Sequence, residues 1–438
     1  QLFLEITARN DKNSTLNPYT NSFFYPSASG SWIFTETFKE KMVNSRLSYG
    51  KVRASWASVG NGAPNAYLTN PAAFATTTSS TSFGSVKFPF NTVPAFSLGN
   101  TIANQLRPAR SLSSEVGVEL GFFKDRIFFE ATYYKSYTYD QIISVPTAPS
   151  SGFTSRTINL GDVANKGLEM ALRFTPVHTK SGFKWDVNAT YTRNRNEVLS
   201  LADGVSRVTI GGFSGMEIAA AVGKPFGAFY AIDNQTDANG YTIVDPNSGL
   251  PKPTTNSVYK GSYQPRFMAS LGTNLSYKGF SLNVLFDTKQ GGVFFSRTKD
   301  IMEFVGTSAN TGNRDEQIFP NSVYLDANGN SVANTTKYTP YDYYTSVAPN
   351  GTHVLDASYI KLREASLGYT LPAKLMKKTG FSSAKVSLFG NNLFIWTSKE
   401  NKYADPEVNT GGNSDEQGLD FSARPSLRNY GISLKVTF

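Results

Sequence analysis

The last nine residues of the chain alternate strictly between apolar and polar side chains. The apolar parity holds Tyr430, Ile432, Leu434, Val436 and Phe438, and the polar parity holds Gly431, Ser433, Lys435 and Thr437. This period of two predicts a β-strand with one apolar and one polar face that runs to the carboxy-terminus. Chain ends usually fray in soluble proteins, whereas the last strand of a bacterial outer-membrane barrel turns its apolar face to lipid. We therefore interpret the five apolar residues as a barrel-assembly signal.

The same alternation predicts about twelve strands along the chain. They lie near residues 1–9, 22–33, 46–59, 110–122, 126–140, 155–175, 183–199, 263–277, 279–296, 353–371, 382–397 and 424–438. In the strand at 353–371 the phase changes, because Ile360 and Leu362 fall on one parity and Leu367 on the other. A β-bulge near Arg363 and Glu364 would produce this change.

Long and short connections between these strands alternate. One end of the sheet receives 10–21, 60–109, 141–154, 200–262, 297–352 and 398–423, and the other receives 34–45, 123–125, 176–182, about 278 and 372–381. Outer-membrane barrels have short periplasmic turns and long extracellular loops. The asymmetry predicts an all-β fold, a transmembrane antiparallel β-barrel, with long extracellular loops at about 60–109, 200–262, 297–352 and 398–423.

Composition agrees with a large β-structure in a membrane. Aromatic residues make up 13% of the chain and charged residues 17%, with a mean hydropathy of −0.30. No apolar run approaches the roughly 18 residues that a membrane helix needs. The chain has no cysteine, which suits an exported protein. Its net charge of +9 comes from scattered residues, so solvated faces or anionic outer-leaflet lipid are favoured over nucleic acid.

Aspartate-containing turns recur in two of the long loops. Asp237 and Asp326 each begin the sequence Asp-Ala-Asn-Gly, and Asn-Gly favours a two-residue hairpin turn. The first turn offers a weaker alternative, a calcium site with oxygen ligands from Asp233, Asp237, Asn239 and Asp245. The spacing of an EF-hand is not met, so the hairpin is favoured and we expect no cofactor.

A cluster of aromatic residues in the loop at 297–352 is the candidate substrate-binding surface. It comprises Tyr338, Tyr341, Asp342, Tyr343 and Tyr344. Tyrosine combines a flat apolar face with a hydroxyl group, which suits sugar rings or peptides. The alternative is that these side chains pack against a partner or neighbouring loops.

Several segments resemble the SusC/RagA family of TonB-dependent outer-membrane transporters of Bacteroidetes. The blocks that carry the resemblance are 106–123 with 131–135 and 140–143, then 158–161, 165–169, 357–369, 388–393 and 403–407, and near the front Arg9 to Asp11, Ser14, 25–27 and Trp32. The resemblance implies a barrel of 22 strands, of which this chain would be the carboxy-terminal part. The plug domain, the TonB-contacting segment and the front of the barrel are not in the sequence.

The resemblance also implies a function and partners. The protein would be part of an importer of oligosaccharides or oligopeptides that works with a SusD-like surface lipoprotein. The TonB complex would act through the plug, and the amino-terminal half of the same transporter would complete the barrel. No covalent chemistry is then required of the chain, and we expect that it is not an enzyme.

Charged residues on the polar parity of the strands would line the barrel interior. They are Glu115, Glu119, Glu130, Glu169, Arg173, Lys184, Asp186, Asp287 and Lys435. An Arg or Lys on the lipid side costs about 2–4 kcal/mol at the bilayer midplane, so this parity is informative. The simplest role for these side chains is hydrogen bonding to a plug.

Two other classes of outer-membrane barrel remain open from the residues alone. A phospholipase-like enzyme needs a Ser-His pair, and the chain offers only His178, in a predicted turn, and His353, beside Thr352 and Asp356. The loops are also longer than such an enzyme needs. The other class is a structural or adhesin barrel.

Overall fold

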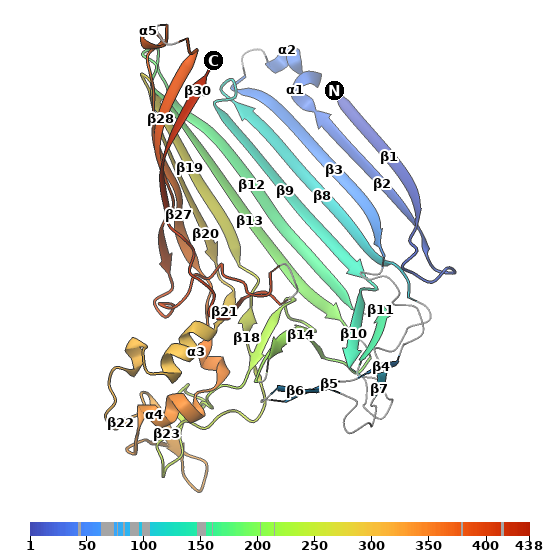
Figure 1. The fold of residues 1–438 in the computed structure, drawn as a ribbon. Coiled ribbons are helices and arrows are strands. Elements are labelled where there is room, and N and C mark those ends of the chain that lie inside the picture. The colour runs from blue at the N-terminus through green and yellow to red at the C-terminus, as the bar shows by residue number, and fades with distance from the viewer. Residues whose placement is uncertain are drawn as a thin grey trace.

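Twelve long strands form one antiparallel sheet, in which each strand pairs with the next of the twelve along the chain (Figure 1). The computed structural model describes residues 1–42, 45–62, 74–76, 78–81, 84–87, 96–98, 106–146, 155–159, 161–201, 203–213, 215–377, 380–412 and 416–438. The strands are β1 (Leu2–Lys12), β2 (Ser22–Ile33), β3 (Leu47–Asn61), β8 (Ala109–Phe122), β9 (Ile127–Tyr139), β12 (Asp162–His178), β13 (Lys184–Ser200), β19 (Phe267–Tyr277), β20 (Phe280–Gln290), β27 (Tyr359–Thr370), β28 (Ser383–Thr397) and β30 (Asn429–Thr437). The predicted all-β fold and strand number are confirmed.

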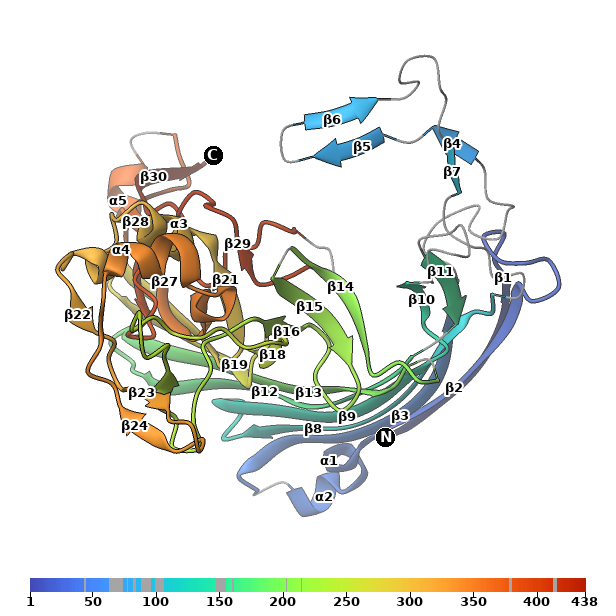
Figure 2. The ribbon, with the colours of Figure 1, turned by 90° about the horizontal axis from the view of Figure 1, so that it is seen from below.

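The sheet curves into an open trough. Figure 2 shows the loops gathered on its concave side, with β1 and β30 at its two edges. Within the described part of the chain, β1 pairs with β2 alone and β30 with β28 alone. The twelve strands therefore form a barrel wall that is not closed.

The two faces of this wall differ in polarity. On β30 the side chains of Tyr430, Ile432 and Leu434 are 66–73% exposed, and they lie on the face away from the loops. The concave face carries polar side chains, such as Asn196, whose Oδ1 accepts a hydrogen bond of 2.7 Å from the loop residue Phe226. The convex face is thus suited to lipid and the concave face to water or protein.

Aromatic pairs mark the end of the sheet that carries the short turns. The ring centroids of Phe381 and Phe438 lie 5.1 Å apart, and those of Phe280 and Tyr369 lie 4.5 Å apart. Trp32 and Phe38 form a similar edge contact beside the amino-terminus of the chain. Rings at this level suit the membrane interface, where their apolar bodies and polar edges are both accommodated.

The predicted bulge in β27 is confirmed. The register of β27 shifts between Leu362 and Glu364 in its pairing with β28, and at the same place in its pairing with β20. Arg363 is the extra residue. Its guanidinium lies on the concave face, where Nε and Nη2 each donate a 2.8 Å hydrogen bond to the Asp287 carboxylate.

Two predicted strands are each split into two elements. The range 279–296 divides at Gly291 and Gly292, whose φ angles of +77° and +80° turn the chain out of the sheet. Residues beyond this turn form β21 (Val293–Ser296), which pairs with β26 (Val354–Asp356) and β29 (Leu419–Asp420). The range 353–371 divides in the same way into β26 and β27.

Other predicted boundaries were wrong by several residues. The range 155–175 was too long at its start, because residues 155–159 form β11, which pairs with β10 in a separate hairpin. The last strand begins at Asn429 rather than at 424. Most of the predicted loop 60–109, and residues 147–154 of the loop 141–154, lie outside the described residues.

The shorter elements are as follows. The strands are β4 (Phe74–Thr76), β5 (Thr78–Thr81), β6 (Gly84–Lys87), β7 (Phe96–Leu98), β10 (Ile142–Pro146), β11 (Ser155–Asn159), β14 (Arg207–Phe213), β15 (Met216–Ala221), β16 (Ala228–Ala231), β17 (Thr242–Ile243), β18 (Val258–Ser262), β22 (Gln317–Ile318), β23 (Ser322–Leu325), β24 (Ser331–Ala333) and β25 (Lys337–Tyr338). The helices are α1 (Phe34–Thr37), α2 (Lys39–Met42), α3 (Arg297–Phe304), α4 (Pro340–Asp342) and α5 (Ala373–Met376), with single turns at Ala309–Thr311, Tyr343–Val347 and Asn350–His353. In the described residues, no helix has the length and apolar character needed to cross a membrane.

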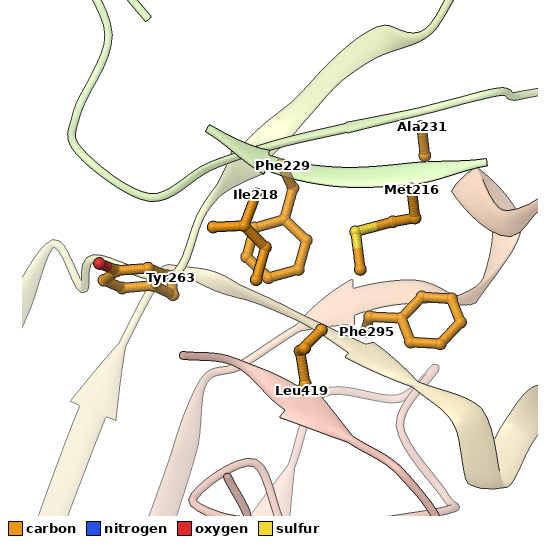
Figure 3. Packing of buried hydrophobic residues seen from close by; sticks show 7 residues of the cluster. All are labelled: Met216, Ile218, Phe229, Ala231, Tyr263, Phe295 and Leu419. Atoms are coloured by element: carbon orange, nitrogen blue, oxygen red, sulfur yellow. The ribbon is translucent and has the colours of Figure 1, made fainter. Parts of the chain in front are cut away.

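Three long connections fold together into what we call the loop body, the described residues of 203–262, 293–358 and 398–426. Its core, shown in Figure 3, consists of Met216, Ile218, Phe229, Ala231, Tyr263, Phe295 and Leu419. Phe229 and Phe295 are fully buried. The core joins residues from all three connections and Tyr263, which lies just before β19. The loop body therefore has its own hydrophobic centre.

Replacing Phe229 with alanine should destabilise the loop body, because it removes a fully buried ring and leaves a cavity. We expect a cost of about 3–5 kcal/mol. Limited proteolysis of the folded barrel would measure it as faster cleavage within 203–262. Leu325→Ala is the control, since Leu325 is 43% exposed and its removal should leave cleavage unchanged. Equal cleavage of the two variants would contradict the assignment of this core.

Deleting Phe438 should reduce barrel assembly several-fold. The side chain is 87% exposed on the convex face and touches Phe381, so it contributes to the aromatic rim rather than to the concave wall. The amount of protein in purified outer membranes measures the effect. Thr437→Ala, on the opposite parity, is the control. Normal membrane levels of the deletion variant would show that Phe438 is not an assembly signal.

Candidate functional site

The concave wall carries opposite charges that pair between strands of the sheet, both between neighbouring strands and across one intervening strand. Lys51 Nζ on β3 lies 3.1 Å from Glu119 Oε1 on β8. Arg53 Nη2 lies 3.1 Å from Glu130 Oε1 and donates a 2.6 Å hydrogen bond to Thr132 Oγ1 on β9. Residues two apart on a strand share a face, so the alternation of the sequence places these side chains together. The wall is polar but largely charge-compensated at this point.

Three open hollows lie along this wall. Their volumes are about 710, 530 and 520 Å³. The predicted interior residues that line them are Glu115, Glu119, Glu130, Glu169, Arg173 and Asp186. Of the other predicted interior residues, Lys184 pairs with Asp186 at 2.7 Å, Asp287 pairs with Arg363, and Lys435 lies in register with Lys385 of β28.

A second charged group ties the loop 398–426 to the concave face of β27. Lys361 Nζ donates hydrogen bonds of 2.8 and 2.7 Å to the two carboxylate oxygens of Asp405 and also contacts Glu407. Arg363 contacts Glu407 as well, and the Tyr359 hydroxyl donates a 2.6 Å hydrogen bond to it. We call these five residues the tether.

Burial of the tether raises the cost of removing one of its charges and affects the pKa of Glu407. Lys361 is 2% exposed and Asp405 is 9% exposed, so removing Lys361 would leave the Asp405 carboxylate without its cation and away from water. Burial opposes ionisation of Glu407, but hydrogen bonds from Arg363, Lys361 and Tyr359 lower its pKa to about 2. Glu407 is therefore ionised at neutral pH.

Another buried charge lies inside the loop body. Glu303 on α3 is 3% exposed, and its carboxylate lies 3.2 Å from His353 Nε2 and 3.3 Å from Lys299 Nζ. Asn310 Nδ2 donates a 3.0 Å hydrogen bond to it. Burial opposes its ionisation, yet the hydrogen bond from His353 and the charge of Lys299 bring the pKa of Glu303 below its usual value. The group joins α3 to the turn at Asn350–His353.

Neither histidine has the surroundings of a catalytic base. His353 is 1% exposed, and in the part of the chain that the structure describes its only hydrogen-bonding partner is Glu303. Thr352 Oγ1 instead donates to the carbonyl of Pro349. His178 is exposed at the last position of β12, rather than within the predicted turn. No Ser-His pair forms at either histidine within the described residues.

The predicted aromatic cluster divides into buried and accessible members. Tyr338 and Tyr343 are each 6% exposed and pack against Phe319, with ring centroids 5.3 and 5.2 Å away. Burial raises the pKa of Tyr343 to about 12. Asp342 is exposed and accepts a hydrogen bond from Thr339 at the start of α4. These contacts favour a packing role for the two buried tyrosines.

The other two tyrosines line a small cavity of about 170 Å³ between α3 and α4. Tyr341 is 75% exposed at its mouth, and Tyr344 is half-buried in its wall. Phe304, Val305 and Pro340 give the cavity an apolar lining, and Arg314 and Glu303 give it charge. A volume of this size suits one ring or one side chain, so the binding prediction now rests on Tyr341 and Tyr344.

The two Asp-Ala-Asn-Gly segments form turns, although not of the predicted two-residue type. Asp237 Oδ1 accepts hydrogen bonds of 2.9 Å from the backbone N–H groups of Asn239 and Tyr241, and Asp326 Oδ1 accepts the equivalent pair. Only the glycine has a positive φ, +83° at Gly240, whereas a two-residue type I′ turn needs two such residues.

The oxygens proposed as calcium ligands are used in other contacts. Asp237 Oδ2 accepts a hydrogen bond of 2.8 Å from Ser331, Asp233 pairs with Lys260, and Asp245 accepts from the backbone of Asn247 and Ser248. Over the described ranges, no group of three or more His, Cys, Asp or Glu side chains could hold a metal ion. These contacts favour turn formation as the role of the aspartates.

The tether is not predicted from the sequence, although its two halves lie in the blocks 357–369 and 403–407 that carry the family resemblance. Tyr359, Lys361 and Arg363 alternate on β27, and Asp405 and Glu407 follow the same spacing in the loop. Two cations facing two anions at equal spacing is a signal for pairing. This charge pattern is visible in the sequence, but the sequence does not show that the loop 398–426 returns to the wall.

Comparison with known proteins places the chain among outer-membrane receptors. Residues 1–393 match the family described as TonB dependent receptor-like, beta-barrel. TonB-dependent receptor P3 of Formosa agariphila is 26% identical over 461 residues, covering 99% of this chain and 43% of the relative. TonB-dependent receptor SusC of Bacteroides thetaiotaomicron is 23% identical over 373 residues, covering 80% of this chain and 34% of that protein.

Solved structures agree on the fold. The RagAB peptide transporter matches with a TM-score of 0.71 and 19% identity, covering 99% of this chain and 45% of that chain. The chain thus spans less than half the length of the relatives it matches. The predicted resemblance to SusC and RagA is confirmed. The relatives are receptors and transporters rather than enzymes, so the phospholipase alternative is rejected.

Acidification should release the tether in a defined window. The pKa of Glu407 is lowered from its ordinary value of 4.5 to about 2. Its ionised carboxylate therefore stabilises the docked loop fully above pH 4.5, and this stabilisation is lost as the pH falls toward about 2. We therefore expect the loop 398–426 to stay docked from pH 7 to about 5 and to loosen progressively between about 4.5 and 2. Because the chain lacks cysteine, an environment-sensitive dye on Glu400→Cys would report the change.

The matched control is the same labelled protein carrying Glu407→Gln. Its side chain cannot ionise, so the loop should already be looser at pH 7 and its dye signal should change less in that window. Identical acid profiles for the two proteins would show that Glu407 does not hold the loop.

Proposed function

Since the chain belongs to the TonB-dependent receptor-like β-barrel family, we propose that it forms the wall and outer loops of an energy-coupled importer in the bacterial outer membrane. The observation that carries the proposal is the contrast between the faces of one twelve-stranded sheet. Its convex face exposes apolar side chains, and its concave face carries paired charges and water-accessible hollows. Such a wall separates lipid from a polar passage.

The loop body has the features of a selective entrance to this passage. It has its own core, and the tether holds one of its three connections against the inside of the wall. A docked loop narrows the opening and orders the side chains around it. We propose that this part of the chain meets the substrate first, at the long-connection end of the sheet.

The substrate class that we propose is oligosaccharides or oligopeptides. Tyr341 and Tyr344 support it, because their rings line a cavity of about 170 Å³ with polar groups nearby. Aromatic faces bind sugar rings by stacking and bind peptide side chains by apolar contact. Peptides gain some support from RagAB, which is a peptide transporter, and from its likeness to this fold.

We propose two partners for the transporter. A SusD-like surface lipoprotein would cover the loop body, which exposes Phe304, Val305 and Tyr341 together around the mouth of the cavity. The TonB complex would supply force through a plug held against the concave wall. The paired charges of Lys51, Arg53 and Glu119 offer hydrogen-bonding groups to such a plug.

Uptake by cells tests the import function. The transporter gene is deleted, and uptake of labelled oligopeptides and of labelled oligosaccharides is compared with and without an uncoupler of the proton gradient. We expect uptake of one class to fall in the deletion strain and to depend on the gradient. Uptake that is unchanged by the gene deletion and by the uncoupler would reject the importer proposal in favour of a structural barrel.

Replacing Tyr341 and Tyr344 with alanine should lower that uptake at least fivefold at limiting substrate. The cavity would lose both of its tyrosine rings while the loop-body core stays intact. Tyr241→Ala is the matched control, because Tyr241 is an exposed tyrosine in the turn at 237–241. If the control and the double variant behave alike, the cavity is not a substrate contact.

A further inference from the structure

The convex face of three neighbouring strands changes abruptly from apolar to basic. On β9, β12 and β13 the outward positions nearest the short turns are apolar over four successive places, for example Trp185, Val187, Ala189 and Tyr191. The next outward positions are Lys135 on β9, Lys166 on β12, and Arg193 followed by Arg195 on β13. The apolar stripe therefore ends at the same register position on β9 and β12, and one outward position earlier on β13.

These cations are direct neighbours across the sheet. Lys166 is in register with Lys135 on one side and with Arg195 on the other, and Arg193 lies one outward position nearer the apolar stripe. All four side chains are exposed. We call Lys135, Lys166, Arg193 and Arg195 the basic row.

The opposite parity of the same strands shows that the basic row faces away from the loops. Asn165, next to Lys166, accepts hydrogen bonds from Asn194 and Asn196, which flank Arg195 along the strand. Asn196 in turn binds the loop residue Phe226 on the concave side. Since successive side chains alternate between faces, the cations point outward from the convex face.

The row has no counter-charge of its own. Among the ion pairs of the described residues, none involves any of the four cations. Glu197, the acid at the next outward position of β13, makes no such pair. Like charges placed directly opposite each other destabilise a sheet. On the concave face of the same wall, by contrast, several cations pair with carboxylates, as Arg53 does with Glu130.

Tyrosines surround the basic row. Tyr133 and Tyr139 are 52% and 38% exposed on either side of Lys135 on β9, and the Lys135 ammonium lies 4.7 Å from the ring centroid of Tyr137. Next to Arg193, the rings of Tyr191 and Phe267 stack with centroids 5.5 Å apart. Tyrosine beside Lys or Arg at the edge of an apolar band is typical of the boundary between acyl chains and head groups.

We propose that the basic row is a binding site for the phosphate groups of an anionic lipid, in the leaflet at the long-connection end of the barrel. Phosphate oxygens would supply the missing counter-charge, and the guanidinium groups of Arg193 and Arg195 can each donate two parallel hydrogen bonds to them. The acyl chains would lie along the apolar stripe below. The site is on the outside of the wall, so it is independent of the transport proposal.

Native mass spectrometry of the whole transporter, purified in detergent, tests the site by titration with defined lipids. The probes are a phosphatidylglycerol or a phosphorylated lipid A, a zwitterionic phosphatidylcholine, and an anionic sulfated lipid without phosphate. We expect retention of the phosphate-bearing anionic lipids at least tenfold above the zwitterionic lipid, falling with added salt. Equal retention of anionic and zwitterionic lipids would overturn the proposal, and equal retention of the sulfated lipid would show a site for charge rather than phosphate.

The variant Lys135→Gln with Lys166→Gln and Arg195→Gln should weaken anionic-lipid retention at least tenfold. The matched control removes three cations from the tight turns, as Lys124→Gln with Lys180→Gln and Lys278→Gln, and should change it less than twofold. Equal loss in both variants would mean a general charge effect and would overturn the site. If the triple variant does not assemble, Lys166→Gln alone is compared with Lys166→Arg, which keeps the charge and should retain the lipid; equal binding by these two would also reject the site.

Discussion

A chain that crosses a membrane as strands must satisfy its backbone N–H and C=O groups inside the protein, because lipid offers no hydrogen bonds. The twelve-stranded ladder meets this requirement along its whole width except at β1 and β30. Much of the remaining architecture follows from it. With the backbone occupied in the ladder, the alternation of side chains decides which face meets lipid and which meets water, and chemistry can vary only at the ends of strands and on the two faces.

The concave face and the loops depend on each other through charge. A lysine that is 2% exposed, such as Lys361, is stable only beside anions, and those anions are in the loop 398–426. The carboxylates of the loop neutralise the buried cation of the wall, and these ion pairs fix the position of the loop. The core around Phe229 and Phe295 then joins this loop to the other two long connections. Packing and electrostatics together join the three long connections into the loop body.

The regular part of this structure could be predicted from the sequence, because a period of two is a local property. The strand number, the parity of Glu115 and Glu119, and the bulge at Arg363 all follow from neighbouring residues. The errors arose where local pattern and chain path disagree. Val293 to Ser296 continue the apolar pattern of β20, but two glycines with positive φ turn them out of the wall. Tyr338 and Tyr343 pack against Phe319, in line with the packing alternative, but the sequence pattern did not separate these two buried tyrosines from the accessible ones.

The bulge in β27 also changes how much charge a strand can present. Inward side chains of a regular strand recur about every 6.7 Å, so a short stretch offers only a fixed number of them. The extra residue at Arg363 adds one more inward cation within that stretch, and Arg363 shares Glu407 with Lys361 while it pairs with Asp287. Removing this single residue would straighten β27 and keep every apolar side chain on its proper face. It would nonetheless leave the Asp287 and Glu407 carboxylates without the guanidinium that pairs with both, so the bulge is a means of balancing charge within the limited space of a pleat.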